Sequence, residues 1–230
     1  MANRRNIIIG GAVVAVAAVG GVGYFAFGQQ QPAATLVAGA VANAPGAEIE
    51  MAKLMAPVGD IPDHPLGSAD AKVVVIEYLS PTCPHCAAFH NGVYPQLKAD
   101  YIDTGKIRFI PRPFVRNILD AVVFMLAESA GEEKYHDIIA TYFKTQDQWA
   151  TSQTPNDAIY AIAQQLGFTK ESYDAALTNQ ALFTGMEQMK EQAIDEFKLE
   201  GTPQFYINGK ILTGEKTIEQ FKAAIDPLLA

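Results

Sequence analysis

Two cysteines, the only ones in the 230-residue chain, stand three positions apart in the stretch Cys83-Pro84-His85-Cys86. They follow an apolar run at 72–79 that is rich in β-branched residues, as is typical of a buried strand. The segment that begins at Ala87 is compatible with a helix. We therefore expect the cysteine pair where a strand leads into a helix, with Cys83 near the N-terminus of that helix.

This placement gives Cys83 a specific chemistry. The first N–H groups of a helix have no partner within it, and together with the helix dipole they stabilise a nearby negative charge. We therefore expect a lowered pKa for Cys83, to which a protonated His85 would contribute, while Pro84 suits the first helical position. Cys86 follows one turn later, close enough to form a disulfide. A stabilised thiolate favours the reduced form and makes such a disulfide more oxidising.

Two other roles for a Cys-x-x-Cys pair compete with redox chemistry. A structural zinc site needs two more ligands, but no second cysteine pair exists, and His64, His90 and His136 are scattered singly. A purely structural disulfide would close a ring too short to constrain the unfolded chain. We therefore favour a redox-active pair and predict neither a metal site nor a cofactor.

The N-terminus predicts export. An apolar run at 7–27 follows Arg4 and Arg5, and it is long enough to span a bilayer, which takes about 20 residues. Residues 1–28 are thus either a signal anchor or a signal peptide cleaved before Gln29. In both cases the arginines stay cytoplasmic and the rest is exported. The expected location is the periplasm or cell envelope, where an oxidising environment lets a reactive disulfide persist.

Charge limits the partners of the exported part. The chain carries a net charge of −8, and because Arg4 and Arg5 supply +2, residues 29–230 carry −10. Nucleic-acid binding relies on basic surface, so nucleic acid is not an expected partner.

The exported part is expected to begin with a tether. Residues 29–63 are rich in Ala, Gln, Gly and Pro and predict a flexible linker, with a short helix within 47–56. After the strand at 72–79, a helix is expected from Pro84 to about Asp103, kinked at Pro95. A strand at 106–110 follows, parallel to the first.

Residues 116–200 carry almost no strand signal and predict an all-helical block. Helices are expected at 118–130, at 132–143, after caps at Thr154 and Thr169, and at about 181–199. Beyond this block, Asn208-Gly209 predicts a two-residue hairpin turn, and Thr217-Ile218-Glu219-Gln220 predicts a capping box at the start of a last helix.

Glu77 is the one acid within the apolar strand. Either it faces solvent at the strand's end, or it is buried below the cysteines and exchanges a proton with Cys86. We favour the second interpretation, because Glu77 lies six positions before Cys83 and close to the end of the strand.

At this point the sequence resembles the bacterial DsbA group of thiol–disulfide oxidoreductases. The matching stretches are Val75-Ile76-Glu77-Tyr78, Cys83-Pro84-His85-Cys86, Gly201-Thr202-Pro203, Lys134-Tyr135 and Gln148-Trp149. The resemblance covers about 64–230 and implies an α/β, thioredoxin-like fold with an inserted all-helical domain. The implied boundaries are 64–114 and 182–230 for the thioredoxin-like domain and 115–181 for the helical insert.

The resemblance also implies roles for the residues around the cysteine pair. Cys83 would be the exposed sulfur that a substrate thiolate attacks, and Cys86 its buried partner. Glu77 would be the acid below the active site, and Pro84 and His85 would tune the thiol chemistry.

A loop late in the chain completes the implied site. Pro203 would be a cis-proline that faces the disulfide, and the backbone of Thr202 would pair with an extended substrate. The implied function is a dithiol oxidase that introduces disulfides into exported, unfolded or partly folded proteins with free thiols. A DsbB-like membrane protein would reoxidise it.

Three alternatives stay open. A threonine at position 202 is also similar to the disulfide isomerases of the Dsb system, so an isomerase or reductase fits the same residues. A copper carrier that uses Cys83, Cys86 and a nearby histidine belongs to a different class. A binding protein with inert cysteines is the last alternative.

Overall fold

The computed structural model describes residues 48–59 and 61–230. The predicted membrane-spanning or signal segment at 7–27 and the predicted tether up to residue 47 lie outside these residues. Across the described ranges, no helix is both long enough and apolar enough to cross a membrane.

In the described part of the chain, five strands form one mixed sheet in the order β1-β3-β2-β4-β5. The strands are β1 Leu66–Gly67, β2 Val73–Leu79, β3 Ile107–Pro113, β4 Gln204–Ile207 and β5 Lys210–Thr213. Strands β2 and β3 are parallel, as predicted, and the other three pairs are antiparallel. The cysteine pair follows shortly after the C-terminal end of the central strand β2, and it therefore lies at the end of the sheet where β2 stops.

One long helical segment joins β2 to β3, with the predicted bounds. It consists of α2 (Pro84–Ala88), a π-helical turn (Phe89–Val93), α3 (Tyr94–Leu97) and a second π-helical turn (Lys98–Ile102). Pro95, at which we predicted a kink, lies in the first turn of α3, between the two π-helical turns. Proline has no N–H group, so the regular α-helical hydrogen-bond ladder is interrupted here.

The segment from 116 to 200 is helical, as predicted. Its helices are α4 Ile118–Ser129, α5 Glu132–Lys144, α6 Gln146–Trp149, α7 Pro155–Gln165, α8 Lys170–Ala176 and α9 Gln180–Asp195. The side chain of Thr169 caps α8, as expected, and Ser172 completes a capping box with it. The predicted cap at Thr154 is wrong in detail, because its side chain makes no capping hydrogen bond, although α7 does begin at Pro155.

The chain ends in the predicted hairpin and helix. Asn208 and Gly209, with φ angles of 45° and 89°, connect β4 to β5. Such a pair of positive φ angles matches the twist of a two-residue hairpin turn. A capping box at Thr217 then starts α10 (Ile218–Leu229).

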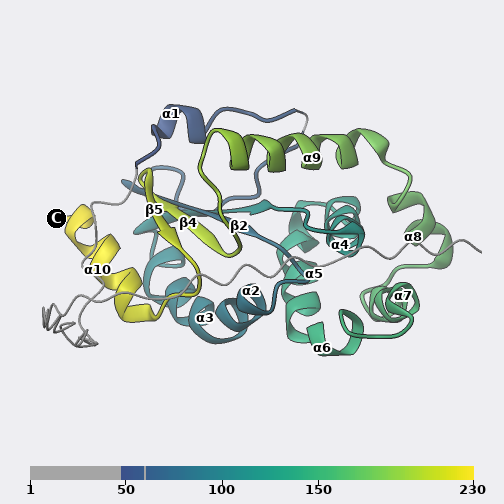
Figure 1. Cartoon of the computed structure of the whole chain (residues 1–230). Coiled ribbons are helices and arrows are strands. Elements are labelled where there is room, and N and C mark those ends of the chain that lie inside the picture. The colour runs from purple at the N-terminus through teal and green to yellow at the C-terminus, as the bar shows by residue number, and fades with distance from the viewer. Residues whose placement is uncertain (1–47, 60) are drawn as a thin grey trace, which may run out of the picture. The chain divides into compact units, whose positions relative to one another are not determined.

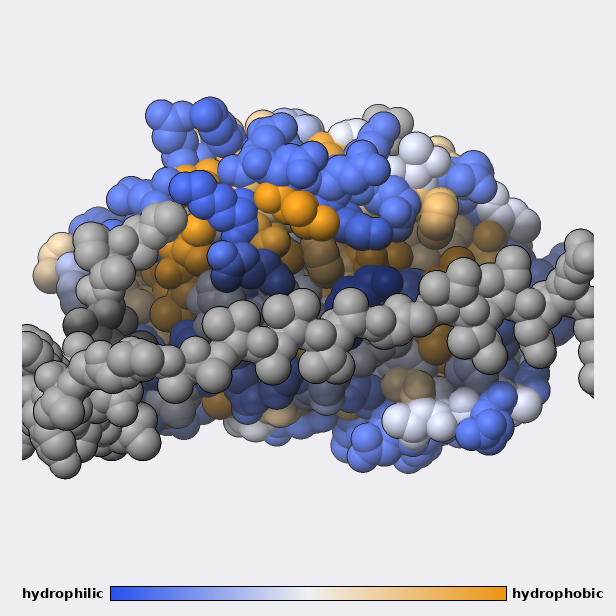
Figure 2. Space-filling model, viewed as in Figure 1, coloured by the Kyte–Doolittle hydropathy of each residue, from blue (hydrophilic) through white to orange (hydrophobic). Residues whose placement is uncertain are grey.

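Helices cover both faces of the sheet (Figure 1). On one face, α10 and the helix after Cys83 pack over β2, β3 and β4 through Val75, Phe89, Phe205 and Phe221. On the other face, α1 (Met51–Leu54) and α9 close a larger core that continues into the helical insert. In the view of Figure 2, hydrophilic residues gather along the upper edge, where α1 and α9 run. Val75 of β2 belongs to the first core and Tyr78 to the second. Because side chains alternate along a strand, Glu77 and Tyr78 point to opposite faces of the sheet.

The last part of the predicted tether is corrected by the structure. Residues 48–59 and 61–63 pack against the sheet: Ile49 and Leu54 are buried, and the Ile49 amide donates a 2.9 Å hydrogen bond to the Gly209 carbonyl. A side chain at Gly209 would overlap the Ile49 carbonyl oxygen. Composition suggested a linker because alanine is frequent over the whole of 29–63, but the last part of that range carries apolar residues, and Ile49, Leu54 and Ile61 among them are buried in the core.

Candidate redox site

Cys83 lies at the predicted junction between strand and helix. It is the N-cap residue of α2 in an extended conformation, and Pro84 is the first residue of the helix. Its carbonyl accepts a 3.1 Å hydrogen bond from the Ala87 amide, and its amide donates to the Ser80 carbonyl at 3.0 Å. The sulfur therefore sits where the first amide groups of the helix point.

This position makes Cys83 acidic. The pKa of its thiol falls from an ordinary value of 9 to about 5, most strongly because the Cys86 thiol donates a hydrogen bond to the sulfur. Burial opposes the shift, while the Thr202 side chain and the backbone N–H groups of Cys86 and His85 support it. Four hydrogen-bond donors thus stabilise the thiolate predicted at position 83.

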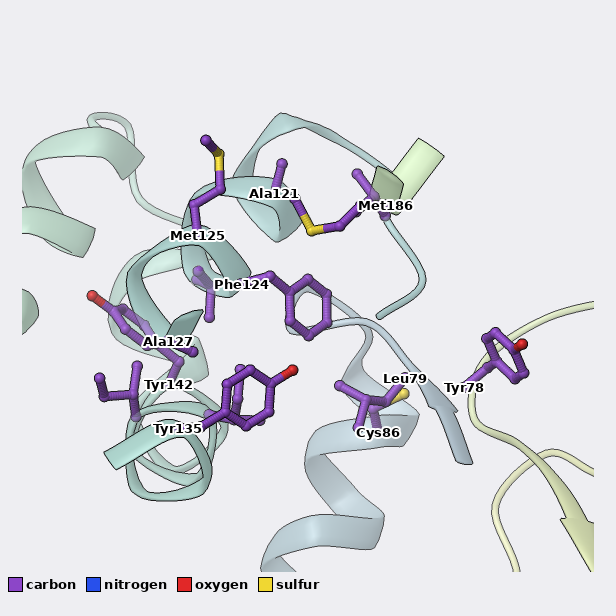
Figure 3. Close-up of a cluster of buried hydrophobic side chains, with 14 of the residues drawn as sticks. Tyr78, Leu79, Cys86, Ala121, Phe124, Met125, Ala127, Tyr135, Tyr142 and Met186 are labelled. Atoms are coloured by element: carbon purple, nitrogen blue, oxygen red, sulfur yellow. The ribbon is translucent and has the colours of Figure 1, made fainter. Parts of the chain in front are cut away.

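Cys86 has the opposite character. It is fully buried, and its pKa lies well above the ordinary value because of burial first, then the hydrogen bond to Cys83 and the charge of Glu77. Figure 3 shows Cys86 in the same buried cluster as Phe124 and Tyr135, which belong to helices α4 and α5. The helical insert therefore supplies the apolar surroundings that keep this thiol neutral.

Cys83 is less exposed than predicted. Only 3% of its surface is accessible, where we expected an open sulfur. It contributes to the wall of a surface pocket of about 530 Å³, whose lining residues are Cys83, Pro84, His85, Phe114, Arg116, Glu200, Gly201 and Thr202. The exposure is small because the loop at Thr202 lies against the sulfur.

That loop carries the predicted cis bond between Thr202 and Pro203. In its protonated form the Cys83 thiol donates a hydrogen bond to the Thr202 carbonyl, with 3.2 Å between sulfur and oxygen. The structure thus joins Cys83, Cys86, Thr202 and Pro203 in one place, although about 120 positions separate the two pairs along the chain.

Glu77 is fully buried, so the alternative in which it faces solvent is wrong. Its carboxylate oxygens lie 2.9 Å and 3.1 Å from Nε2 of His90, a residue for which the sequence suggested no role. The charge of Glu77 contributes, after burial and the hydrogen bond to Cys83, to the raised pKa of the Cys86 thiol.

His85 contributes to the site differently from our expectation. Its imidazole is exposed, and Nδ1 lies 3.4 Å from a carboxylate oxygen of Glu215. The part of His85 that stabilises the Cys83 thiolate is its backbone N–H.

Sequence reasoning missed two residues that hold the cysteine loop. The carboxylate of Asp120, in α4, is fully buried and accepts hydrogen bonds from the Ser80 hydroxyl, the Thr82 amide and the Arg116 amide at 2.7–2.9 Å. Gln146, in α6, donates to the carbonyls of Pro81 and Cys83 at 2.7 Å and 3.0 Å. The signal that identified Glu77, an acid inside an apolar run, is also present at Asp120.

Over the ranges that the structure describes, no three His, Cys, Asp or Glu side chains come together in an arrangement that could hold a metal ion.

Comparisons with known proteins agree with this geometry. The sequence model of the thioredoxin family matches residues 60–227. A Rickettsia bellii protein, provisionally named a protein-disulfide oxidoreductase, is 37% identical over 71% of this chain and 63% of its own length. The crystal structure of Wolbachia pipientis alpha-DsbA1 superposes with a TM-score of 0.71 and 27% identity, covering 77% of this chain and 94% of that one.

A further neighbour is a protein-disulfide isomerase from Novosphingobium aromaticivorans, with a TM-score of 0.65 and 25% identity over 73% of this chain and 97% of that one. The chain spans less than two thirds of the length of the rickettsial relatives that it matches. The fold predicted from the sequence is confirmed by these neighbours, and the chain belongs to the thioredoxin family, with the architecture of its DsbA-like members.

Proposed function

We propose that this protein is an exported dithiol oxidase that introduces disulfide bonds into other exported proteins. The observation that carries the proposal is the difference between its two thiols. Cys83 has a pKa of about 5, whereas burial holds the pKa of Cys86 far above 9. The reduced pair is therefore stabilised by one thiolate, and a disulfide whose reduced form is stabilised is a strong oxidant.

The reaction proceeds by two thiol–disulfide exchanges. A substrate thiolate attacks Cys83 Sγ, a new S–S bond forms, and the Cys83–Cys86 bond breaks with its electron pair going to Cys86. A second substrate thiolate then attacks the substrate sulfur of this mixed disulfide. The Cys83 thiolate leaves, and the substrate retains the new disulfide. The substrate loses two electrons and the cysteine pair gains them.

The two cysteines suit these two roles. Cys83 borders the pocket, so a substrate sulfur reaches it and not the fully buried Cys86. Its low pKa also makes it the better leaving group in the second exchange. Pro84 and His85 form the start of the helix that stabilises the thiolate, and Glu77 tunes the buried partner.

Substrate binding is assigned to the loop at Thr202 and Pro203. An extended peptide that adds to this loop by backbone hydrogen bonds would place a cysteine beside Cys83, independently of the rest of its sequence. This mode suits unfolded or partly folded clients with free thiols. Arg116 and Glu200 stand at the same pocket and would contact charged flanking residues.

The cycle needs an oxidant and an oxidising compartment. We propose a DsbB-like membrane protein as the reoxidant and the periplasm or cell envelope as the location, with the N-terminal segment either cleaved or retained as an anchor. The proposal rests on the apolar segment at 7–27 and on the requirement of a reactive disulfide for an oxidising environment.

Two measurements test the oxidase assignment. Equilibration with glutathione gives the reduction potential, and thiol trapping in living cells gives the redox state of the pair. We expect an oxidising potential, closer to the value of about −120 mV known for DsbA than to that of thioredoxin at about −270 mV, and a mostly oxidised pair in cells. An ordinary thiol pKa together with a thioredoxin-like potential would contradict the assignment.

An isomerase is the second candidate. It is favoured by the solved neighbour that is named a protein-disulfide isomerase. The two functions differ in the refolding of scrambled ribonuclease, which an isomerase catalyses while it is kept reduced. A mostly reduced pair in cells combined with efficient unscrambling would favour the isomerase.

A further inference from the structure

In the proposed reaction the buried sulfur of Cys86 must receive a proton. When the Cys83–Cys86 bond breaks, Cys86 leaves as an anion in apolar surroundings with no accessible surface of its own. Water therefore has no direct contact with it. An unpaired buried charge is costly, so the sulfur must be protonated. Because the sulfur has no accessible surface, the proton must come from solvent through a chain of titratable groups.

Such a chain of groups begins at Glu77, because it is hydrogen-bonded to His90, which lies one turn after Cys86 in the same helical segment, and because its charge acts on Cys86. The Glu77 carboxylate has no exposed surface, but both of its oxygens lie within hydrogen-bond distance of His90 Nε2. The His90 side chain is 9% exposed. It therefore lies between the fully buried acid and the surface.

His90 is held firmly in this position. Its ring stacks on Phe143 of α5 at 4.4 Å between centroids and 16° between planes, and Tyr94 lies on the same ring at 4.9 Å. The neighbouring Asn91 donates a hydrogen bond to the Phe143 carbonyl at 3.1 Å. Both residues belong to the π-helical turn Phe89–Val93, a local structure that is frequent at functional sites.

The exposed side of His90 opens into a second cavity, the His90 pocket, of about 400 Å³. Helix α5, the helix after Cys83 and strand β3 supply most of its lining. It shares no lining residue with the pocket that Cys83 borders. A proton that enters by this route does not cross the place where the substrate binds.

We propose that His90 is the proton carrier of the redox site, which connects Cys86 through Glu77 to the solvent in the His90 pocket. This inference rests on the proposed thiol–disulfide exchange and adds to it a route for the proton. When the disulfide is cleaved, a proton passes from His90 to the Glu77 carboxylate and from Glu77 to the Cys86 sulfur, which leaves Glu77 as a carboxylate again, and water then gives a proton back to His90. Each transfer moves one proton and no electrons. Reoxidation returns the proton by the reverse path.

The other titratable groups near His90 leave this route open. Those that line the pocket or adjoin the ring are Cys86 of α2, Glu77 of β2, Tyr94 of α3, Lys98 of the second π-helical turn, and Glu133, Tyr135, His136 and Asp137 of α5. Burial lowers the pKa of His136 to about 4 and raises the pKa values of Tyr94 and Tyr135. These three groups are neutral near pH 7, and none of them is among the hydrogen-bond partners of Glu77.

The test measures cleavage of the Cys83–Cys86 bond in the oxidised full-length chain. Excess glutathione forms the mixed disulfide at Cys83, and acid quench followed by alkylation and mass spectrometry gives the rate. His90→Gln keeps a hydrogen-bond donor for Glu77 but does not shuttle protons. We expect roughly 100-fold slower cleavage, the lower end of what a positioned acid–base group contributes. A Lys98→Gln variant, in which another residue that lines the His90 pocket is changed, should show the same rate of Cys83–Cys86 bond cleavage as the unaltered protein.

Chemical rescue separates proton transfer from a structural role. In His90→Ala, free imidazole should enter the cavity and restore the rate, whereas pyrazole, a ring of the same size but a far weaker base, should not. Equal rescue by both rings, or an unaltered rate and pH profile in His90→Gln, would overturn the inference. If instead the unaltered protein fails to oxidise dithiols at all, the proposed function fails, independently of His90.

Discussion

The side-chain amide of Gln146 donates one hydrogen bond to the Cys83 carbonyl at 3.0 Å and another to the Pro81 carbonyl at 2.7 Å. Gln146 belongs to the helical insert, so the insert holds the backbone of the reactive cysteine. Asp120, also in the insert, fixes Ser80 and Thr82 on the other side of the same loop. The position of the sulfur at the helix N-terminus therefore depends on both parts of the fold.

A Gln146→Ala substitution should destabilise the protein by about 1–3 kcal/mol. It leaves the Pro81 carbonyl without its side-chain partner in a buried place, which costs the desolvation of that group. Urea unfolding of the reduced chain measures the effect. Gln148→Ala, an exposed position on the same short helix, is the matched control and should change stability by less than about 0.5 kcal/mol. Equal losses in both variants would show that the contact does not support the loop.

Features set by neighbouring residues were predictable from the sequence. The hairpin at Asn208-Gly209, the cap at Thr169, the capping box at Thr217 and the strand-to-helix junction at Cys83 all formed as predicted. Each depends on the preferences of a few adjacent residues, which the sequence displays directly.

Contacts between distant segments were not predictable in the same way. Gln146 meets Cys83 across 63 positions, and Ser80 meets Asp120 across 40. His90 carried no signal of its own, because the acid that it binds lies on a strand 13 positions earlier. The low exposure of Cys83 depends on the loop at Thr202, which packs against it only in the folded chain. Such pairings arise from tertiary packing.

Arg112 attaches the N-terminal stretch of the described chain to the sheet, and its substitution should strongly destabilise the protein. The guanidinium is buried, pairs with both Asp63 oxygens at 2.7 Å and also donates to the Leu54 carbonyl. Arg112→Leu leaves the carboxylate and the carbonyl without this donor, so we expect a loss of about 3 kcal/mol in the free energy of unfolding. Thermal and urea unfolding both measure it.

The control for this variant is an exposed ion pair. Lys53 lies 3.7 Å from Glu50 with both side chains largely in solvent, and such pairs contribute about 1 kcal/mol or less. Lys53→Met should therefore unfold almost as the unaltered protein does. If both variants lost a similar amount of unfolding free energy, the buried Arg112 pair would contribute no more to stability than an exposed ion pair.

Thr202 should influence the acidity of Cys83 through its hydroxyl group. A hydrogen bond from this side chain lowers the pKa of the Cys83 thiol, and Thr202→Val removes the donor while it keeps the shape. We expect the pKa of Cys83 to rise above 5 but to stay below 9, because the Cys86 thiol and two backbone amides still donate. The pH dependence of alkylation by iodoacetamide gives the value. Thr151→Val, at an exposed threonine of the insert, should leave the curve in place, and a matching shift there would refute this explanation.

The acidity of Cys83 should also make the stability of the reduced chain depend on pH. In the folded state its pKa is about 5, against an ordinary value of 9 for an unfolded cysteine. Between these values the folded chain binds fewer protons than the unfolded chain, so its stability rises with pH. The stabilisation is fully present near pH 9 and is lost as the pH falls to 5. Cys86 adds almost nothing below about pH 8, because it is protonated in the folded state and largely protonated in the unfolded state; closer to pH 9 its raised pKa begins to oppose the gain.

The oxidised chain has no thiol to ionise, so the difference in stability between the two redox forms isolates this effect. We expect the free energy of unfolding of the reduced form, minus that of the oxidised form, to increase steadily from pH 5 to pH 8 in urea titrations. In Cys83→Ser, which has only the neutral Cys86 thiol, the reduced chain should lack this slope. Parallel stability curves for the two redox forms of the unaltered protein would mean that the thiolate is not stabilised by the folded state, and the disulfide would then lose the physical basis of its oxidising character.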